Sequence, residues 1–298
     1  MTIPAFVIWN VNPEIFHIGA LSIRYYGLLF AMAFFVGYLI MENVYKTERV
    51  DVRDVDRLSL HMILGVVIGA RLGHILFYQP AEYFADPIQI LQIWKGGLAS
   101  HGAAIGIIIA MYLYSRKGPV RSIIWILDRI ILTVPIGGFF VRMGNLMNSE
   151  IYGHVTNLPW GFKFYPTEYY EEYGVEKTRV ITDGLYHHPT QIYEGLLYLA
   201  LFFVLWGLYK KKHATLKPGT LFGVFLILLF GIRFFVEYFK EVQVGFEYDL
   251  LAKYGLNLGQ LLSIPFMLLG AGLLIWSLTG NRQYKGITRV TDMKEKEG

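Results

Sequence analysis

The chain has 298 residues, of which 54% are hydrophobic and only 17% are charged, and its net charge is +4. Soluble domains carry about 25% charged residues, so this composition indicates a membrane protein, and the small net charge predicts no nucleic-acid partner. The sequence contains no cysteine, which excludes a disulfide framework, a thiolate metal site and a thiol nucleophile supplied by the chain itself.

Apolar runs long enough to cross a bilayer predict seven transmembrane helices. A span needs about 17–25 apolar residues. Such runs occur at 22–43, 58–78, 101–116, 122–142, 190–209, 219–239 and 257–278, of which the third is the shortest. We therefore expect an all-α polytopic membrane protein in which residues 1–278 form a single seven-helix domain.

The distribution of positive charge predicts the orientation of these helices. Lysine and arginine are concentrated between the first two runs, after the third, after the fifth and at the C-terminal end. Cytoplasmic loops carry such an excess, so we expect the N-terminus outside (periplasmic) and the C-terminus in the cytoplasm. Residues 279–298 would then form a polar, mobile cytoplasmic tail, and the long segment 143–189 would form a head outside the membrane, as functional loops do.

Glycines recur at four-residue spacing on two neighbouring runs. They are Gly65, Gly69 and Gly73 on the second run, and Gly102 and Gly106 on the third. Small residues at this spacing allow two helices to approach closely. We interpret them as packing residues.

Most polar residues within the runs lie near the outer end of a predicted helix. A charge at the centre of a bilayer costs about 2.5–3.5 kcal/mol or more, so polar groups that share one depth predict a common cavity open outward or sideways. These residues are Tyr26, Arg71, His74, His101, Arg142, Gln191, Glu194, Arg233, Glu237 and Gln260.

Some charged residues have a purely structural alternative. Lys240 is expected to extend to the lipid headgroups. The same interpretation applies to Asp128 and Arg129, which are consecutive in the sequence. Arg233 and Glu237 are i,i+4 neighbours, which would allow them to form an ion pair on one helix face.

The fourth run ends in a polar block that predicts a phosphate-binding site at the membrane surface. Arg142 in this block and Arg233 come from different runs at the same predicted depth. Two guanidinium groups can bind a phosphate and neutralise its developing charge. Asn145, Asn148 and Glu150 could orient these arginines or bind glycerol hydroxyls.

His101 is a candidate general base at the start of the third run. The positive end of a helix dipole disfavours imidazolium, and a neutral imidazole can accept a proton. The preceding Ser100 could cap this helix. The sequence has no HExxH pair, P-loop or nucleophile elbow, so we expect neither a metal nor a cofactor.

Six ordered blocks resemble the prolipoprotein diacylglyceryl transferase family, between Ile23 and Pro265. The longest, RMGNLMNSEIYG at 142–153, is similar to the family pattern Gly-Arg-x-Gly-Asn-x-x-Asn-x-Glu-x-x-Gly. The chain departs from the family at Val141, Leu146 and Leu229, where the family has glycine, phenylalanine and tyrosine. The other blocks are RYYG at 24–27, GGLASHG at 96–102, HPTQIYE at 188–194, RFFVE at 233–237 and GQLLSIP at 259–265.

This resemblance implies a multi-pass enzyme of the bacterial inner membrane. Its reaction would transfer the diacylglyceryl group of phosphatidylglycerol to the thiol of the lipobox cysteine in a prolipoprotein signal peptide, the first step of lipoprotein maturation. A thioether would form and glycerol phosphate would leave. The absence of cysteine fits this reaction because the substrate supplies the nucleophile, which attacks as a thiolate.

For this reaction we expect three catalytic residues. His101 would assist deprotonation of the thiol, while Arg142 and Arg233 would bind the phosphodiester and stabilise the departing phosphate. Alternatively, the arginines would lower the pKa of the thiol directly and make His101 less central. Residues expected to bind or position the substrate are Tyr26, Arg142, Asn145, Asn148, Glu150, Gly153, Glu194 and Glu237.

Two other functional classes are weaker. A lipid transporter or flippase would require a polar path to the cytoplasmic face and is often built from repeats with paired broken helices, whereas the polar residues here lie mostly at one side. A scaffold protein would leave the cluster of arginine, histidine and asparagine without a cause.

Overall fold

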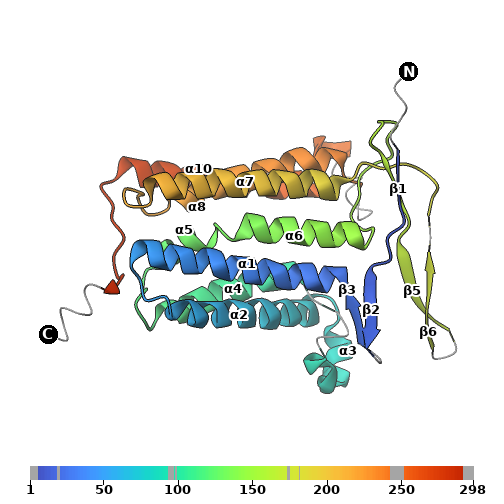
Figure 1. Ribbon diagram of the computed structural model, residues 1–298, viewed down its shortest axis with the longest axis horizontal. Coiled ribbons are helices and arrows are strands. Elements are labelled where there is room, and N and C mark those ends of the chain that lie inside the picture. The colour runs from blue at the N-terminus through green and yellow to red at the C-terminus, as the bar shows by residue number, and fades with distance from the viewer. Residues whose placement is uncertain are drawn as a thin grey trace. The chain divides into compact units, whose positions relative to one another are not determined.

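The computed structural model describes residues 6–18, 21–92, 97, 99–172, 175–180, 182–241 and 252–290, and most of them are helical (Figure 1). Among these residues, five helices are long and apolar enough to cross a membrane. They are α1 (Tyr25–Glu48), α2 (Asp54–Phe77), α7 (Thr190–Lys212), α8 (Thr220–Val236) continued by η3 (Glu237–Phe239), and α10 (Leu258–Thr279).

The two remaining predicted spans take a different form. The 122–142 run is divided into α5 (Ile123–Ile130) and α6 (Val134–Met147), a bent pair that counts as one span only when taken together. The break precedes Pro135, which lacks an N–H and would clash with the carbonyl four residues earlier. The 101–116 run becomes α4 (Ser100–Ser115), which has only 16 residues. The structure thus confirms a polytopic membrane protein with five or six candidate spans among the described residues.

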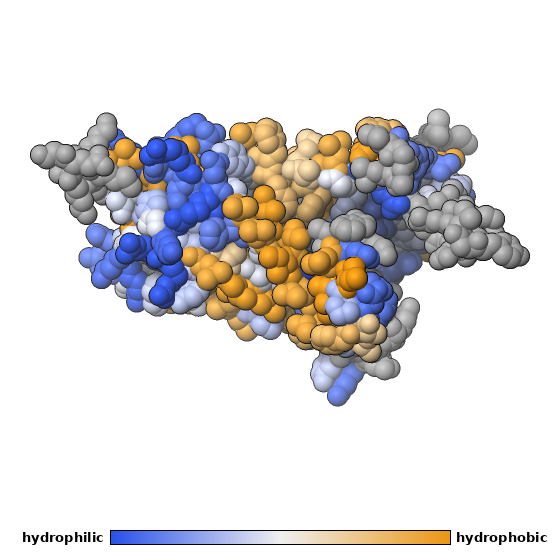
Figure 2. Space-filling model, turned by 90° about the horizontal axis from the view of Figure 1, so that it is seen from below, coloured by the Kyte–Doolittle hydropathy of each residue, from blue (hydrophilic) through white to orange (hydrophobic). Residues whose placement is uncertain are grey.

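Large apolar side chains are exposed on the apolar helices, as lipid-facing residues are. Ile108, Phe203 and Leu268 are 62%, 62% and 68% exposed. Figure 2 shows a broad area of apolar residues on one face of the molecule. Exposed apolar areas of this extent mark a surface that something apolar covers, which in a polytopic membrane protein is the hydrocarbon of the bilayer.

The helices belong to two compact units, and the first comprises residues 1–37 and 130–281. In this unit α6 packs on α7, α7 on α8, and α8 on α10, which Figure 1 shows as neighbouring helices. Glycines permit the close approach. A Cβ at Gly138 of α6 would lie 2.7 Å from the ring of Tyr198 on α7, and one at Gly270 of α10 would lie 2.9 Å from the carbonyl of Gly223 on α8.

Within the described residues of the first unit, short strands form three two-stranded sheets. One joins distant segments in parallel, while the other two are antiparallel pairs of consecutive strands. Three of the six strands come from the predicted head, residues 143–189, which is therefore a folded segment. The pairs are β1 (Val7–Trp9) with β4 (Phe162–Phe164), β2 (Glu14–Ile18) with β3 (Leu21–Arg24), and β5 (Thr167–Glu172) with β6 (Val175–Val180).

The second unit, residues 38–129 and 282–298, is built on the pairing of α2 with α4. A Cβ at Gly73 of α2 would lie 2.6 Å from the Cα of Gly102, and one at Gly69 would lie 2.8 Å from the Cα of Gly106. This close contact confirms the packing interpretation of the glycines. The short helices α3 (Pro80–Ala85) and η1 (Pro87–Leu91) follow α2.

Asp128 and Arg129 are buried, so the expectation that they extend to the membrane surface is wrong. Their exposed fractions are 0% and 1%. The Arg129 Nε donates to Glu48 Oε1 at 2.8 Å, and the Tyr284 hydroxyl donates to Asp128 Oδ2 at 2.7 Å. Both partners lie far away in the sequence, and they satisfy charged groups that would otherwise need water.

The described part of the C-terminal segment is bound to the second unit, although we expected a mobile tail. The backbone N–H of Arg121 donates to the carbonyl of Gly286 at 2.7 Å. Thr288 and Val290 donate in turn to the carbonyls of Pro119 and Arg49, each at 2.8 Å. Residues 286–290 therefore form a strap across two loops of this unit.

Candidate functional site

The polar block predicted to form the site is the end of α6 and the turn that follows it. Ser149 and Ile151 have φ angles of 54° and 59°, in the left-handed region that is unfavourable for a β-branched residue. The Glu150 N–H donates to the Asn145 carbonyl, and the Thr190 hydroxyl donates to the Ile151 carbonyl, both at 3.0 Å. Strained backbone held in this way is typical of functional sites.

Arg142 is oriented by a carboxylate from α7. Its Nη2 lies 2.9 Å from Oε1 of Glu194, whose side chain is 0% exposed. Its Nη1 donates to Asn145 Oδ1 at 3.2 Å. The Tyr198 hydroxyl donates to the same oxygen of Glu194. A guanidinium has five N–H donors, so Arg142 is fixed in direction while retaining donors for an anionic ligand.

The remaining residues of the block form one hydrogen-bonded group. Asn145 Nδ2 donates to Glu150 Oε1 at 2.8 Å, and Asn148 Nδ2 donates to the same oxygen at 3.2 Å. Tyr26, in the first turn of α1, lies against Gly144, where a Cβ would be 2.7 Å from its ring. The structure thus brings together five of the predicted binding residues with Arg142, namely Tyr26, Asn145, Asn148, Glu150 and Glu194.

Gly153 allows two chain segments to cross. Its N–H donates to the His188 carbonyl at 2.9 Å, and a Cβ here would lie 2.7 Å from the Thr190 methyl group. A side chain has no space at this position, so glycine is required for the close approach of the backbones. Gly153 therefore shapes the turn.

Two histidines border this crossing. The ring of His187 lies with Nδ1 2.8 Å from the Gly153 carbonyl and Nε2 2.7 Å from Asp183 Oδ2. Burial lowers the pKa of His188, and the neighbouring imidazoles of His154 and His187 act in the same direction. Within the part of the chain that the structure describes, no three His, Cys, Asp or Glu side chains gather as metal ligands would.

Lys240 is also part of the site, a placement that was not predicted from the sequence. Its Nζ lies 3.0 Å from Glu194 Oε2 and 3.3 Å from Glu237 Oε2, and the side chain is only 5% exposed. The expectation that Lys240 extends to the headgroups is therefore wrong. The i,i+3 spacing from Glu237 could have suggested one of these contacts, but nothing in the sequence indicated the contact with Glu194.

Arg233 does not form the i,i+4 pair that was considered for it. Glu237 pairs with Lys240 instead, and its carboxylate lies against Gly259. Arg233 is half-buried, and it makes no hydrogen bond or ion pair with any residue in the described ranges. Its guanidinium lies close enough to Tyr198 for an electrostatic interaction with the phenol. Within the described ranges, no protein group therefore accepts from this guanidinium.

His101 belongs to the second unit and occupies the first turn of α4, as predicted. The N-cap of this helix is Ala99 and not the expected Ser100. The exposed imidazole lies 5.0 Å from the Phe77 ring and 5.8 Å from the Tyr78 ring, measured between centroids. It is therefore accessible from outside this unit and flanked by aromatic residues.

The backbone before His101 is held by an arginine of α2. Arg71 is 4% exposed and donates from Nε to the Ile90 carbonyl at 3.0 Å and from Nη1 to the Gly97 carbonyl at 3.2 Å. The Ala99 N–H donates to the Ala70 carbonyl at 2.9 Å. Arg71 thus positions the loop that leads into His101.

Comparison with known proteins identifies relatives over nearly the whole chain. Residues 13–276 match the family model described as prolipoprotein diacylglyceryl transferase. Three relatives carry the name phosphatidylglycerol–prolipoprotein diacylglyceryl transferase. The protein of Porphyromonas gingivalis is 45% identical, covering 92% of this chain and 96% of the relative. That of Tolumonas auensis is 39% identical (90% and 96%), and that of Chloroherpeton thalassium is 40% identical (93% and 97%).

Proposed function

The chain belongs to the prolipoprotein diacylglyceryl transferase family and is a transferase, and we propose that it joins the diacylglyceryl group of phosphatidylglycerol to the thiol of a lipobox cysteine in prolipoproteins. The thiolate sulfur forms a bond to the terminal glyceryl carbon of the lipid, and the bond from that carbon to the phosphate oxygen breaks. A thioether and glycerol phosphate result. This is the first step of lipoprotein maturation.

The observation that carries this proposal is the pattern of protein contacts made by two guanidinium groups in the first unit. Arg142 is oriented by Glu194 and Asn145, and Arg233 is left without an ion pair among the described residues. Guanidinium groups bind phosphate through directed, charge-assisted hydrogen bonds. Donors already aimed at the position where charge develops stabilise a transition state without further reorganisation, so both arginines stabilise the departing phosphate.

The other site residues position these groups or the headgroup. Glu194 and Lys240 fix Arg142, while Asn145, Asn148 and Glu150 stabilise the strained turn. Tyr26 and Glu237 complete the set of binding residues. His101 takes the proton from the thiol, because only the thiolate is an effective nucleophile.

A mass measurement tests the reaction directly. Purified protein is incubated with phosphatidylglycerol and a peptide that contains a lipobox, and we expect the peptide to gain the mass of one diacylglyceryl group. A peptide with serine in place of the cysteine is the matched control and should gain nothing. If the cysteine peptide keeps its mass, the proposed reaction is wrong.

We place the enzyme in the bacterial inner membrane with seven spans in a single domain, residues 1–278, followed by a cytoplasmic segment, 279–298. The spans are the five long helices, the α5–α6 pair and α4. The absence of cysteine makes this topology easy to test. Cysteine at Val155 should react with an impermeant thiol reagent on intact spheroplasts, while cysteine at Lys211 should react only after lysis. Equal labelling of both before lysis would contradict the orientation.

The role of His101 is tested with acceptors that differ in ionisation. We expect His101→Gln to lower the transfer rate to an ordinary lipobox peptide by about 10²–10⁴-fold, the usual contribution of a general base. With an acceptor that is already a thiolate at the assay pH, the same substitution should lower the transfer rate much less. Equal losses with both acceptors would show that His101 has another role and would favour direct activation of the thiol by the arginines.

A further inference from the structure

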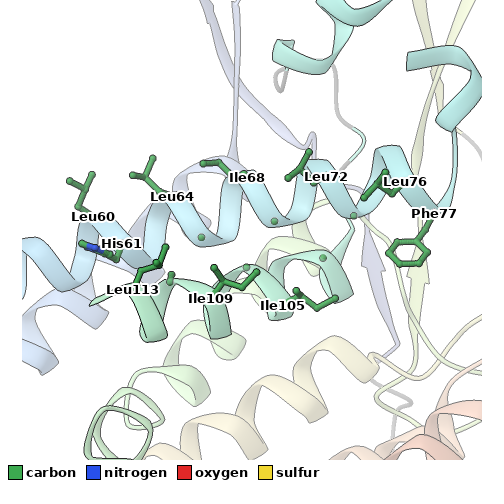
Figure 3. Close-up of a pocket in the computed structure, with 16 residues that line it drawn as sticks. Leu60, His61, Leu64, Ile68, Leu72, Leu76, Phe77, Ile105, Ile109 and Leu113 are labelled. Atoms are coloured by element: carbon green, nitrogen blue, oxygen red, sulfur yellow. The ribbon is translucent and has the colours of Figure 1, made fainter. Parts of the chain in front are cut away.

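A long apolar groove follows the pair formed by α2 and α4. Its volume is about 580 Å³, within the range of about 300–1,000 Å³ that small-molecule sites occupy. Figure 3 shows its two walls, a row of side chains at i,i+4 spacing on α2 and a shorter row on α4, with glycines between them. The walls are Leu60, Leu64, Ile68, Leu72 and Leu76 on one side, and Ile105, Ile109 and Leu113 on the other.

The glycine contact forms the floor of this groove and keeps it open. Gly65, Gly69, Gly73, Gly102 and Gly106 all line the groove. The two helices meet there at backbone distance, and a Cβ at Gly65 would lie 2.7 Å from the Ala110 Cβ. The floor therefore carries no side chain larger than the methyl group of Ala110, whereas the leucine and isoleucine rows project beside it.

The two ends of the groove differ. At one end lies His61, the only ionisable residue of the lining, and its Nδ1 lies 2.7 Å from the carbonyl of Arg57. At the other end lie Phe77 and Gly102. Gly102 follows His101 in the chain, and the ring of Phe77 lies 5.0 Å from that of His101. The apolar groove thus leads to the candidate general base.

We propose that this groove binds one acyl chain of the diacylglyceryl lipid, with the glyceryl end of that chain toward His101. The inference rests on the proposed function and assigns an acyl-chain subsite to it. The lining provides apolar contacts along its whole length, as a hydrocarbon chain requires. Because lipid tails are as apolar as leucine side chains, such a groove contributes little affinity but fixes the position of the chain relative to His101.

The size of the groove favours an acyl chain over a helical peptide. The α2 row from Leu60 to Leu76 extends about 24 Å at a rise of 1.5 Å per residue. A helix of that length and about 10 Å in diameter has a volume of roughly 1,900 Å³, which exceeds even the 1220 Å³ of empty space in and above the groove. A helix could rest on the rim, whereas an unbranched chain can lie along the floor.

Matched tryptophan variants test the subsite. Leu64 lies in the groove far from His101, and its neighbour Ile63 is exposed on the same helix but outside the groove. We expect Leu64→Trp to lower the ratio of the transfer rate from dipalmitoyl to that from didecanoyl phosphatidylglycerol about tenfold, the usual effect of changing the methylenes that a pocket accepts. Ile63→Trp should leave this ratio unchanged. Ile109→Trp, with Ile108→Trp as its control, repeats the comparison on α4.

A binding measurement without turnover separates the subsite from the reaction. Phosphatidylglycerol with a photoreactive diazirine at the end of one acyl chain should label α2 and α4 in the wild type, several-fold less in Leu64→Trp, and equally in Ile63→Trp. If Leu64→Trp matches Ile63→Trp in both labelling and chain-length ratio, the inference is overturned. If Leu64→Trp slows both lipids alike and raises the KM for the peptide, a helix occupies the groove and the inference is again overturned. Groove labelling without any transfer would instead count against the proposed reaction alone.

Discussion

Replacement of Arg142 by lysine is expected to abolish most diacylglyceryl transfer, although the positive charge is retained. The guanidinium donates through Nη2 to Glu194 and through Nη1 to Asn145 while keeping further donors for phosphate. An ammonium group is a compact point charge without this planar fork, so it cannot occupy both contacts and still aim donors at the ligand. Loss of one directed donor typically lowers kcat by about 10²–10³, and we expect a loss of that size or larger.

The measurement is kcat with saturating phosphatidylglycerol and a lipobox peptide. Arg53→Lys is the matched control, because that side chain is 90% exposed and, within the described part of the chain, its ion pair is with Asp51 nearby in the loop. The control should keep its rate. If Arg142→Lys retains more than a small fraction of the wild-type rate, Arg142 acts only through its charge, and directed binding of the phosphate is contradicted.

Arg233→Ala provides the complementary observation. Arg233 makes no ion pair with any described residue, so its removal leaves no charge uncompensated in the fold. We therefore expect transfer to fall while the thermal transition in detergent stays where it is in the wild type. A large loss of stability in Arg233→Ala would instead assign this residue a structural role.

Much of the site was predictable because it is local in sequence. Asn145, Asn148 and Glu150 follow Arg142 within three turns of chain, so the end of one helix and its turn bring them together whatever the rest of the fold does. The helices were predictable for a similar reason, since a long apolar run has few alternatives in a membrane. The break before Pro135 is also a local effect, although the pattern of hydrophobicity concealed it.

The contacts that could not be predicted join residues far apart in the chain. Lys240 resembles many lysines at the end of a span, and only the position of Glu194 on another helix shows that it is buried in an ion pair. Arg129 is a similar case, because its partner Glu48 lies at the end of α1. Interfacial exposure is the default for such residues, and a single sequence does not contain the tertiary partner that reverses it.

Substitution of Glu194 by glutamine is expected to have the largest effect on stability. The carboxylate is 0% exposed and lies between two cations, with Arg142 at one oxygen and Lys240 at the other. The neutral amide would leave both cations in a buried site without their shared counter-charge. Breaking a buried ion pair costs about 3–5 kcal/mol, and we expect the free energy of unfolding in detergent to fall by an amount in this range.

A double substitution separates charge from shape. Glu194→Gln combined with Lys240→Met removes one negative and one positive charge together, so the stability of the double variant should exceed that of Glu194→Gln alone by at least 1 kcal/mol, about the scale of coupling between contacting residues. Transfer should remain low in both variants, because Arg142 loses its orienting carboxylate in each. If Lys240→Met, which also breaks the pair with Glu237, adds to the destabilisation instead of relieving it, uncompensated positive charge is not the main cause of the loss in Glu194→Gln. Recovery of stability without recovery of transfer would show that the same carboxylate neutralises the buried cations and aims Arg142.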